Sequence, residues 1–243
     1  MYTKGLTAAV AALLLLTGCG GDGGGSSSGS GTAYNYVAPM LNSTRTYSET
    51  ITDNSNNMIS IGYSDAITTV NSDGSVSQLS QSTTGDSNIV NGTNYAIVTE
   101  NQNFNAMGQE TSYVYTDPSG AQVTCTFDPH GGGPDFPVMV GETWELIYTF
   151  ACGTGATIAY AQSGSIVDVE SITVPAGTYT AIKIQSMLTW TDAVGTTRMQ
   201  TITNWRDVAT LYSVKESISI AYSGTLPTVG YAVNREILLE SMS

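Results

Sequence analysis

The sequence predicts an all-β protein, an antiparallel meander that forms a curved sheet, a half-barrel or a sandwich after a signal peptide and a flexible linker. Residues 178–190 and 211–222 alternate between apolar and polar side chains, which is the two-residue period of a half-buried strand. Turn signals rich in Gly, Pro, Asn and Asp recur between such segments. After residue 18 we find no stripe of apolar side chains at helical spacing.

The first 18 residues have the features of a signal peptide. Lys4 provides a positive flank, and the apolar run Leu6–Leu16 follows it with 11 residues. A helix needs about 20 residues to cross the hydrocarbon core of a bilayer. The run is therefore too short to span a membrane, and we expect cleavage after Gly18.

The end of this segment, Leu16-Thr17-Gly18-Cys19, resembles the lipobox of bacterial lipoproteins. The resemblance implies that Cys19 carries acyl chains such as palmitate on its sulfur and its amine. Gly20, where an inner-membrane lipoprotein of a Gram-negative bacterium often has Asp, implies the outer membrane. The alternative is an ordinary secretory signal that happens to contain a cysteine. Several acyl chains make a stable anchor where one would not.

We expect three regions along the chain. Residues 1–18 are the signal, residues 19–32 are the lipidated Cys19 with a flexible Gly/Ser tether, and residues 33–243 are one β domain. The hydrophobic fraction of 41% is sufficient for a core. Charged residues are only 11% of the chain, so Ser, Thr, Asn and Gln must cover much of the surface.

The net charge of −13 excludes nucleic acid as a partner, because affinity for phosphates depends on Lys and Arg. The expected partners are the lipid bilayer, through Cys19, and an envelope protein or a glycan. Tyr is abundant, and exposed tyrosines could stack on sugars or hold lipid; the alternative is that they are ordinary strand residues.

Cys125 and Cys152 are left once Cys19 is assigned to lipid. In an oxidising compartment an even remainder indicates one disulfide. Each cysteine alternates onto the apolar face of its segment, in AQVTCTF and in WELIYTFAC. A bridge can form if the two strands are neighbours, and the alternative is two buried free thiols.

Four turns separate the expected strands. They lie at residues 71–74, 117–120, 175–177 and 192–195, and the second has Pro and Gly at the positions that a type I turn favours. The segment Val174-Pro-Ala-Gly-Thr-Tyr179 resembles the V-P-A-G-T-[FY] segment of exported bacterial all-β families of unknown function. Residues 138–243 carry this resemblance, which implies a curved antiparallel sheet and no catalytic residue. In these families a Tyr follows a downstream Trp and a Gly follows a downstream Val, and both residues are missing here.

Candidate chemistry is sparse. Asp128, His130 and Asp135 lie in one glycine-rich stretch and are weak candidates for a metal site; the alternative is a long connection with an exposed histidine. We expect no cofactor. Glu216 alternates onto the apolar face of its segment, where we expect an ion pair with Arg198 or Arg206 rather than a catalytic acid.

These observations predict a non-enzymatic, outer-membrane-anchored lipoprotein with binding or structural duties in the cell envelope. One alternative is a carrier that holds an apolar or lipid ligand in a half-barrel, which requires an open cavity of about 300 Å³ or more. Another is a metal-assisted or acid–base hydrolase that uses His130 with a carboxylate. The site residues that follow are Cys19 for lipidation and Cys125 with Cys152 for the disulfide, with no catalytic residue.

The substitution Cys19→Ser tests the anchor. We expect the variant to keep its signal segment and to leave the membrane fraction, because a hydroxyl cannot take the thioether-linked lipid. Cell fractionation and intact-mass spectrometry of both proteins measure the two effects. Normal maturation and unchanged membrane association of the variant would show that the anchor is assigned wrongly.

Overall fold

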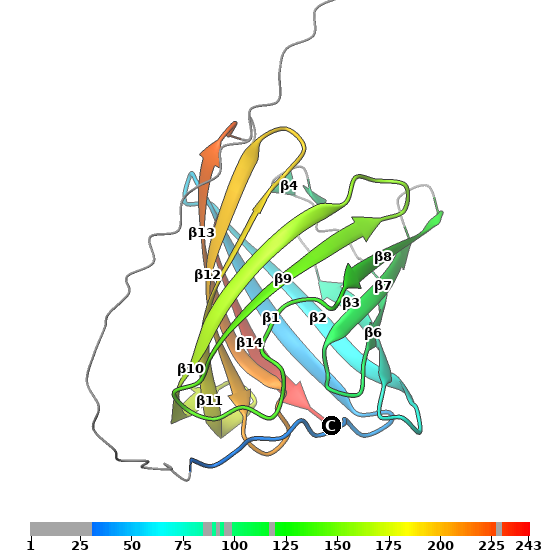
Figure 1. The fold of residues 1–243 in the computed structure, drawn as a ribbon, viewed down its shortest axis with the longest axis vertical. Helices are drawn as coiled ribbons and strands as arrows, with labels where there is room; N and C mark the ends of the chain where they lie inside the picture. The colour runs from blue at the N-terminus through cyan, green and yellow to red at the C-terminus, as the bar shows by residue number, and fades with distance from the viewer. Residues whose placement is uncertain (1–30, 85–88, 91–92, 95–98, 117–119, 227–229) are drawn as a thin grey trace, which may run out of the picture. The chain divides into compact units, whose positions relative to one another are not determined.

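The structure is a computed structural model that describes residues 31–84, 89–90, 93–94, 99–116, 120–226 and 230–243. Its described residues form strands joined by turns and loops (Figure 1). No helix among these residues is long and apolar enough to cross a membrane. The strands are β1 (Thr44–Asp53), β2 (Met58–Val70), β3 (Val76–Thr84), β4 (Ile89–Val90), β5 (Thr93–Asn94), β6 (Thr99–Phe104), β7 (Glu110–Thr116), β8 (Gln122–Asp128), β9 (Thr143–Cys152), β10 (Ile158–Val174), β11 (Gly177–Thr191), β12 (Thr196–Asp207), β13 (Ser213–Gly224) and β14 (Ala232–Met242).

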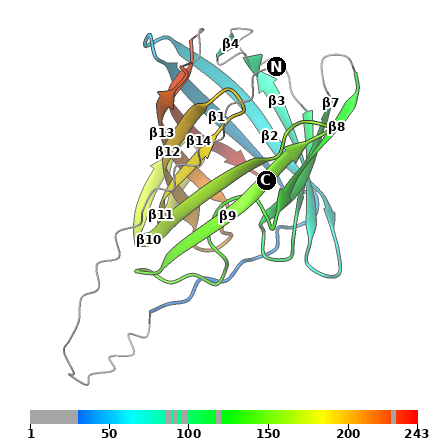
Figure 2. The same cartoon turned by 45° about the horizontal axis from the view of Figure 1, so that its top comes forward.

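Twelve of these strands form one closed antiparallel barrel in the order β1-β14-β13-β12-β11-β10-β9-β8-β7-β6-β3-β2. The remaining pair, β4 and β5, is a separate two-stranded sheet. The all-β antiparallel meander is therefore confirmed. The half-barrel is corrected to a closed barrel, because β1 pairs with β2 on one side and with β14 on the other. Figure 2 shows the strands arranged around a common axis.

Alternation along β1 shows how the sequence divides inside from outside. Every second side chain of this strand is buried. The outward positions are all hydroxyl residues, namely Thr44, Thr46, Ser48, Thr50 and Thr52. The inward positions are Arg45, Tyr47, Glu49, Ile51 and Asp53. The inside of the barrel thus receives charged groups as well as apolar ones.

The two segments with the clearest alternation are strands, as predicted. In β11, Ile182 and Ile184 are buried, and in β13, Val214, Ile218 and Ile220 are buried. The turn at 71–74 joins β2 to β3, the turn at 175–177 joins β10 to β11, and the turn at 192–195 joins β11 to β12. The turn predicted at 117–120 falls between β7 and β8 in the sequence, but residues 117–119 lie outside the described part and its form stays a prediction.

Three apolar clusters fill different parts of the interior. One is aliphatic and lies between β1, β2 and β13, with Ile51, Ile59, Ile61, Ile218 and Ile220. A second contains Phe136, Val138, Ile166, Ile182, Ile184 and Leu211. The third joins the β10–β11 hairpin to β1, β13 and β14 through Tyr47, Val174, Ala181, Val214 and Leu239. The hairpin reaches β14 directly, since the amide of Ala176 donates to the carbonyl oxygen of Leu239 at 3.1 Å.

The segment before β1 packs against the loop between β8 and β9. Tyr34 and Val138 exchange two backbone hydrogen bonds of 2.8 and 3.0 Å, and Tyr34 and Tyr36 pack against the cluster of Phe136. Figure 1 shows this segment, in dark blue, running across the lower end of the barrel. It brings Tyr36 and Pro39 to the cavity described below.

A row of inward aromatic side chains crosses β7 to β11. The ring centroids of Tyr148 and Tyr160 are 5.1 Å apart, and those of Tyr160 and Trp190 are 5.2 Å apart. Phe127 and Phe150 continue the row at 5.0 Å. On the same two strands, Cys125 lies opposite Cys152 in the register of β8 and β9, and the two cysteines form the expected disulfide.

Gly164 on β10 allows close approach of two neighbours. A Cβ at this position would lie 2.7 Å from the backbone oxygen of Gln185 and 2.7 Å from the ring of Trp144. We therefore expect Gly164→Ala to lower the free energy of unfolding by about 1–3 kcal/mol through overpacking. Urea unfolding checks this, with Gly31→Ala as the control, because its nearest neighbour would be 3.9 Å away. Equal stability of both variants would contradict the expected clash.

Candidate ligand-binding site

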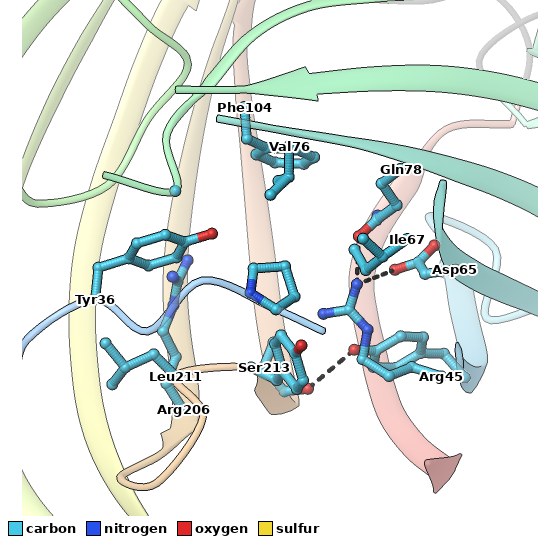
Figure 3. Close-up of a pocket in the computed structure, with 14 residues that line it drawn as sticks. Tyr36, Arg45, Asp65, Ile67, Val76, Gln78, Phe104, Arg206, Leu211 and Ser213 are labelled. Carbon is cyan, nitrogen blue, oxygen red and sulfur yellow. Dashed lines mark hydrogen bonds and ion pairs between the residues drawn. The ribbon is translucent and has the colours of Figure 1, made fainter. Parts of the chain in front are cut away.

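A cavity of about 190 Å³ lies inside the barrel, where the segment before β1 meets β1, β2, β3, β6, β12, β13 and the loops after β6 and β12. Figure 3 shows its lining side chains. The charged and amide-bearing residues are Arg45, Asp65, Gln78 and Arg206, the phenols are Tyr36, Tyr47 and Tyr212, and the remainder are Pro39, Ile67, Val76, Phe104, Gly108, Leu211 and Ser213. Positive charge and hydrogen-bonding groups thus converge on one space within the barrel, as they do in small-molecule sites.

Arg45 is held on one side of this cavity, in an almost fully buried position at 7% exposure. Its Nη2 donates a hydrogen bond to Oε1 of Gln78 and lies 4.0 Å from Oδ2 of Asp65. Its guanidinium stacks 4.1 Å from the ring centroid of Tyr212. The Nε of Arg45 has no hydrogen-bond partner, so one buried donor is left open.

The phenols of Tyr36 and Tyr47 stay neutral over the physiological range. Burial raises the pKa of Tyr36 and of Tyr47, although Arg45 and Arg206 both act to lower these pKa values. The hydroxyl of Tyr47 donates to the carbonyl oxygen of Ser213 at 3.2 Å. Burial also raises the pKa of Asp65, against the opposing effect of Arg45.

A second interior cavity, of about 160 Å³, shares Arg206 with the first. Here the Nε of Arg206 donates to Oδ1 of Asn204 at 3.2 Å. The Nδ2 of Asn204 in turn donates to Oε2 of Glu216 at 2.7 Å. Trp144 also lines this cavity, and its buried Nε1 has no hydrogen-bond partner.

The predicted ion pair of Glu216 takes a different form. Glu216 does face the interior, but Asn204 separates it from Arg206, and no ion pair within 4.0 Å joins them. Arg198 pairs instead with Asp192 at 3.2 Å. The side-chain amide of Asn204 reaches the carboxylate of Glu216 because the two residues lie directly opposite each other in the register of β12 and β13.

The weak metal candidates are not brought together as one set. The Nε2 of His130 lies 3.5 Å from Oδ1 of Asp135, which also accepts a hydrogen bond from Gln109. Asp128 is exposed on β8. His130 is buried, contrary to the alternative of an exposed histidine. The described residues contain no group of three His, Cys, Asp or Glu that could hold a metal ion.

Sequence reasoning missed the cluster of Arg45, Asp65 and Gln78. A signal was present, since Arg45 occupies the inward position of an alternating strand in TRTYSETITD. Such a charge must find a partner inside. The partners lie on β2 and β3, and the strand pattern alone does not say which inward residues will meet.

The two interior cavities do not match the expectation for an apolar carrier. That hypothesis requires an open cavity of about 300 Å³ lined by apolar side chains. These two cavities measure about 190 and 160 Å³, and arginines face both. Two larger hollows, of about 670 and 430 Å³, are lined mostly by hydroxyl, amide and charged side chains rather than by apolar ones. Cys19 and the tether up to residue 30 lie outside the described residues, so lipidation stays a prediction.

Comparison with known proteins finds similar folds and identifies no function. No protein-family model matches the chain, and no curated protein matches it either. A crystal structure from Bacteroides fragilis, described as a "putative exported protein with YmcC-like fold", has a TM-score of 0.51 at 11% identity and covers 87% of this chain and 100% of its own. A "putative lipoprotein" from Parabacteroides distasonis has a TM-score of 0.51 at 13% identity and covers 87% and 99%. At these identities the likeness shows a shared fold.

A pair of acidic side chains sits elsewhere inside the barrel, on β6 and β7. Burial raises the pKa of Glu110 to about 7, and the negative charge of Glu100 adds to the effect. The Oε1 of Glu110 is buried without a hydrogen-bond partner. Burial likewise raises the pKa of Glu100. The folded barrel therefore binds protons that the unfolded chain releases at lower pH.

We expect the free energy of unfolding to fall between about pH 4.5 and pH 7, because over this range the unfolded chain ionises Glu110 before the folded barrel does. In the variant Glu110→Gln, the free energy of unfolding should fall much less over this range. It should exceed that of the native protein by up to about 3 kcal/mol at pH 8 and differ little from it at pH 4. Urea unfolding at several pH values measures it. Glu145→Gln, on the outer face of β9, serves as the control. Identical pH profiles for both variants would contradict the assignment.

Proposed function

We propose that this chain is a lipid-anchored protein of the bacterial outer membrane that does no chemistry and holds a small polar ligand inside its barrel. The observation that carries the proposal is the interior cavity of about 190 Å³ in which Arg45, Arg206, Gln78 and three phenols converge. Side chains of these types bind and orient polar molecules.

The envelope address draws support from the sequence. The segment Leu16-Thr17-Gly18-Cys19 resembles a lipobox, and Gly20 suits an outer-membrane destination. The two similar structures are described as a "putative exported protein" and a "putative lipoprotein". An envelope protein or a glycan remains the partner class that we propose for the outer surface.

Binding rather than catalysis is supported by which residues line the cavity. The chain has one histidine, and His130 is not among the lining residues. Its Nε2 faces Asp135, whose side chain is largely exposed. General acid–base work usually needs two differently tuned groups at the reacting atoms. The hydrolase hypothesis is therefore less well supported than binding.

The substitution Val76→Phe tests the proposal, because Val76 is buried and lines the cavity. We expect the native full-length protein, isolated from membranes, to carry or take up from an envelope extract one small ligand by native mass spectrometry. The filled variant should bind at least about tenfold more weakly. Ser77→Phe is the matched control, since Ser77 is the next residue of β3 and hydrogen bonds to Asn103 on β6.

Three results would overturn the proposal. One is that the native protein neither carries nor takes up any small molecule. Another is that Val76→Phe binds as the native protein does. A third is that the recovered ligand is chemically converted, which would show turnover rather than binding.

A further inference from the structure

Positive charge is scarce in this protein, and its placement is uneven. The chain has 7 Lys and Arg against 20 Asp and Glu, and with Lys4 in the signal segment six positive side chains remain. Two of these six, Arg45 and Arg206, line the same interior cavity. A strongly acidic protein thus places a third of its remaining positive side chains around one interior cavity.

Those two arginines differ from the other four positive side chains. Each of the four has a carboxylate oxygen within 3.4 Å, in the pairs Lys183–Glu170, Arg198–Asp192, Lys215–Glu236 and Arg235–Glu49. The nearest carboxylate oxygen to Arg45 is at 4.0 Å. For Arg206 no carboxylate oxygen lies within 4.0 Å among the described residues. The cavity therefore contains the two least neutralised cations of the described chain.

Arg206 is positioned without being neutralised. Its Nε donates to the amide oxygen of Asn204, and its guanidinium lies 5.8 Å from the ring centroid of Phe136. Burial lowers the pKa of Arg206, while Glu216 acts in the opposite direction. A buried cation in such a setting gains from any negative charge that enters.

Arg45 also has a hydrogen-bond donor that no protein group uses. Gln78 and Tyr212 fix its guanidinium by a hydrogen bond and by stacking, and its buried Nε donates to nothing. Leaving a buried donor without a partner costs about 1–3 kcal/mol, which a ligand oxygen would recover. Figure 3 places Arg206 with Tyr36 on one side of the cavity and Arg45 with Asp65 on the other.

We propose that the cavity binds an oxyanion, the carboxylate or phosphate group of a small molecule, between Arg206 and Arg45. A guanidinium presents a planar fork of donors that fits either group. The cavity of about 190 Å³ has room for about six waters at ~30 Å³ each, so the ligand is small. Asp65 lies on the Arg45 side, so the oxyanion lies closer to Arg206. This inference rests on the proposed function and names the chemical class of its ligand.

The experiment uses the full-length protein in a buffer of low ionic strength that contains neither phosphate nor carboxylate. Inorganic phosphate, succinate and uncharged glycerol are titrated separately by calorimetry. We expect phosphate or succinate to bind with a dissociation constant of about 1 mM or lower, and glycerol not to bind. Binding of one anion but not the other tells which group the site takes.

Variants locate the binding. Arg206→Gln and Arg45→Gln should each weaken binding at least about tenfold. Lys183→Gln removes the same charge from the outer face of β11, where Lys183 pairs with Glu170, and should leave the affinity within about twofold. Arg206→Lys keeps the charge without the fork, and we expect an intermediate affinity even if Arg206→Gln folds poorly.

The inference is wrong if the native protein binds neither anion, or if Lys183→Gln weakens binding as much as Arg206→Gln does. It also fails, while the proposed function survives, if the ligand displaced by Val76→Phe has neither a carboxylate nor a phosphate. Failure of uptake altogether would instead defeat the proposed function.

Discussion

Closure of the sheet is the constraint on which the rest of this structure depends. Because β1 hydrogen bonds to both β2 and β14, each of the twelve barrel strands has two neighbours. In a closed barrel the alternation of a strand becomes a division between an enclosed interior and an outer face. A side chain at an inward position, such as Arg45, must then be satisfied by other inward side chains or by a bound molecule.

The interior solves this requirement differently in different places. Isoleucines pack together between β1, β2 and β13, and aromatic rings follow one another across β7 to β11. Elsewhere, polar side chains form short chains of hydrogen bonds, such as the one from Arg206 through Asn204 to Glu216. Three of the residues that keep a buried polar atom without a hydrogen-bond partner, Arg45, Asp65 and Trp144, line the two cavities.

The sequence was sufficient for features that depend on neighbouring segments. Alternation identified β11 and β13, and their connections followed from the Gly, Pro and Asp residues of the turns. The disulfide of Cys125 with Cys152 was expected from the even number of cysteines left after Cys19 and from the position of each on the apolar face of its strand. Closure was not predictable, because the pairing of Arg45 with Met242 joins distant segments and leaves no local pattern. For the same reason the cavity was missed, since its residues come from the segment before β1, six strands and two loops.

The same closure has a consequence for how the chain reaches its native state. The meander can form hairpin by hairpin from β6 to β13, but β1 has its second partner only when β14 is in place. Until then β1 and β13 each present a row of unpaired amides and carbonyls, which is the kind of edge that recruits strands from other chains. Contacts between such distant segments form slowly. The exposed edges of β1 and β13 therefore need protection during folding, either by a chaperone or by rapid pairing of β14.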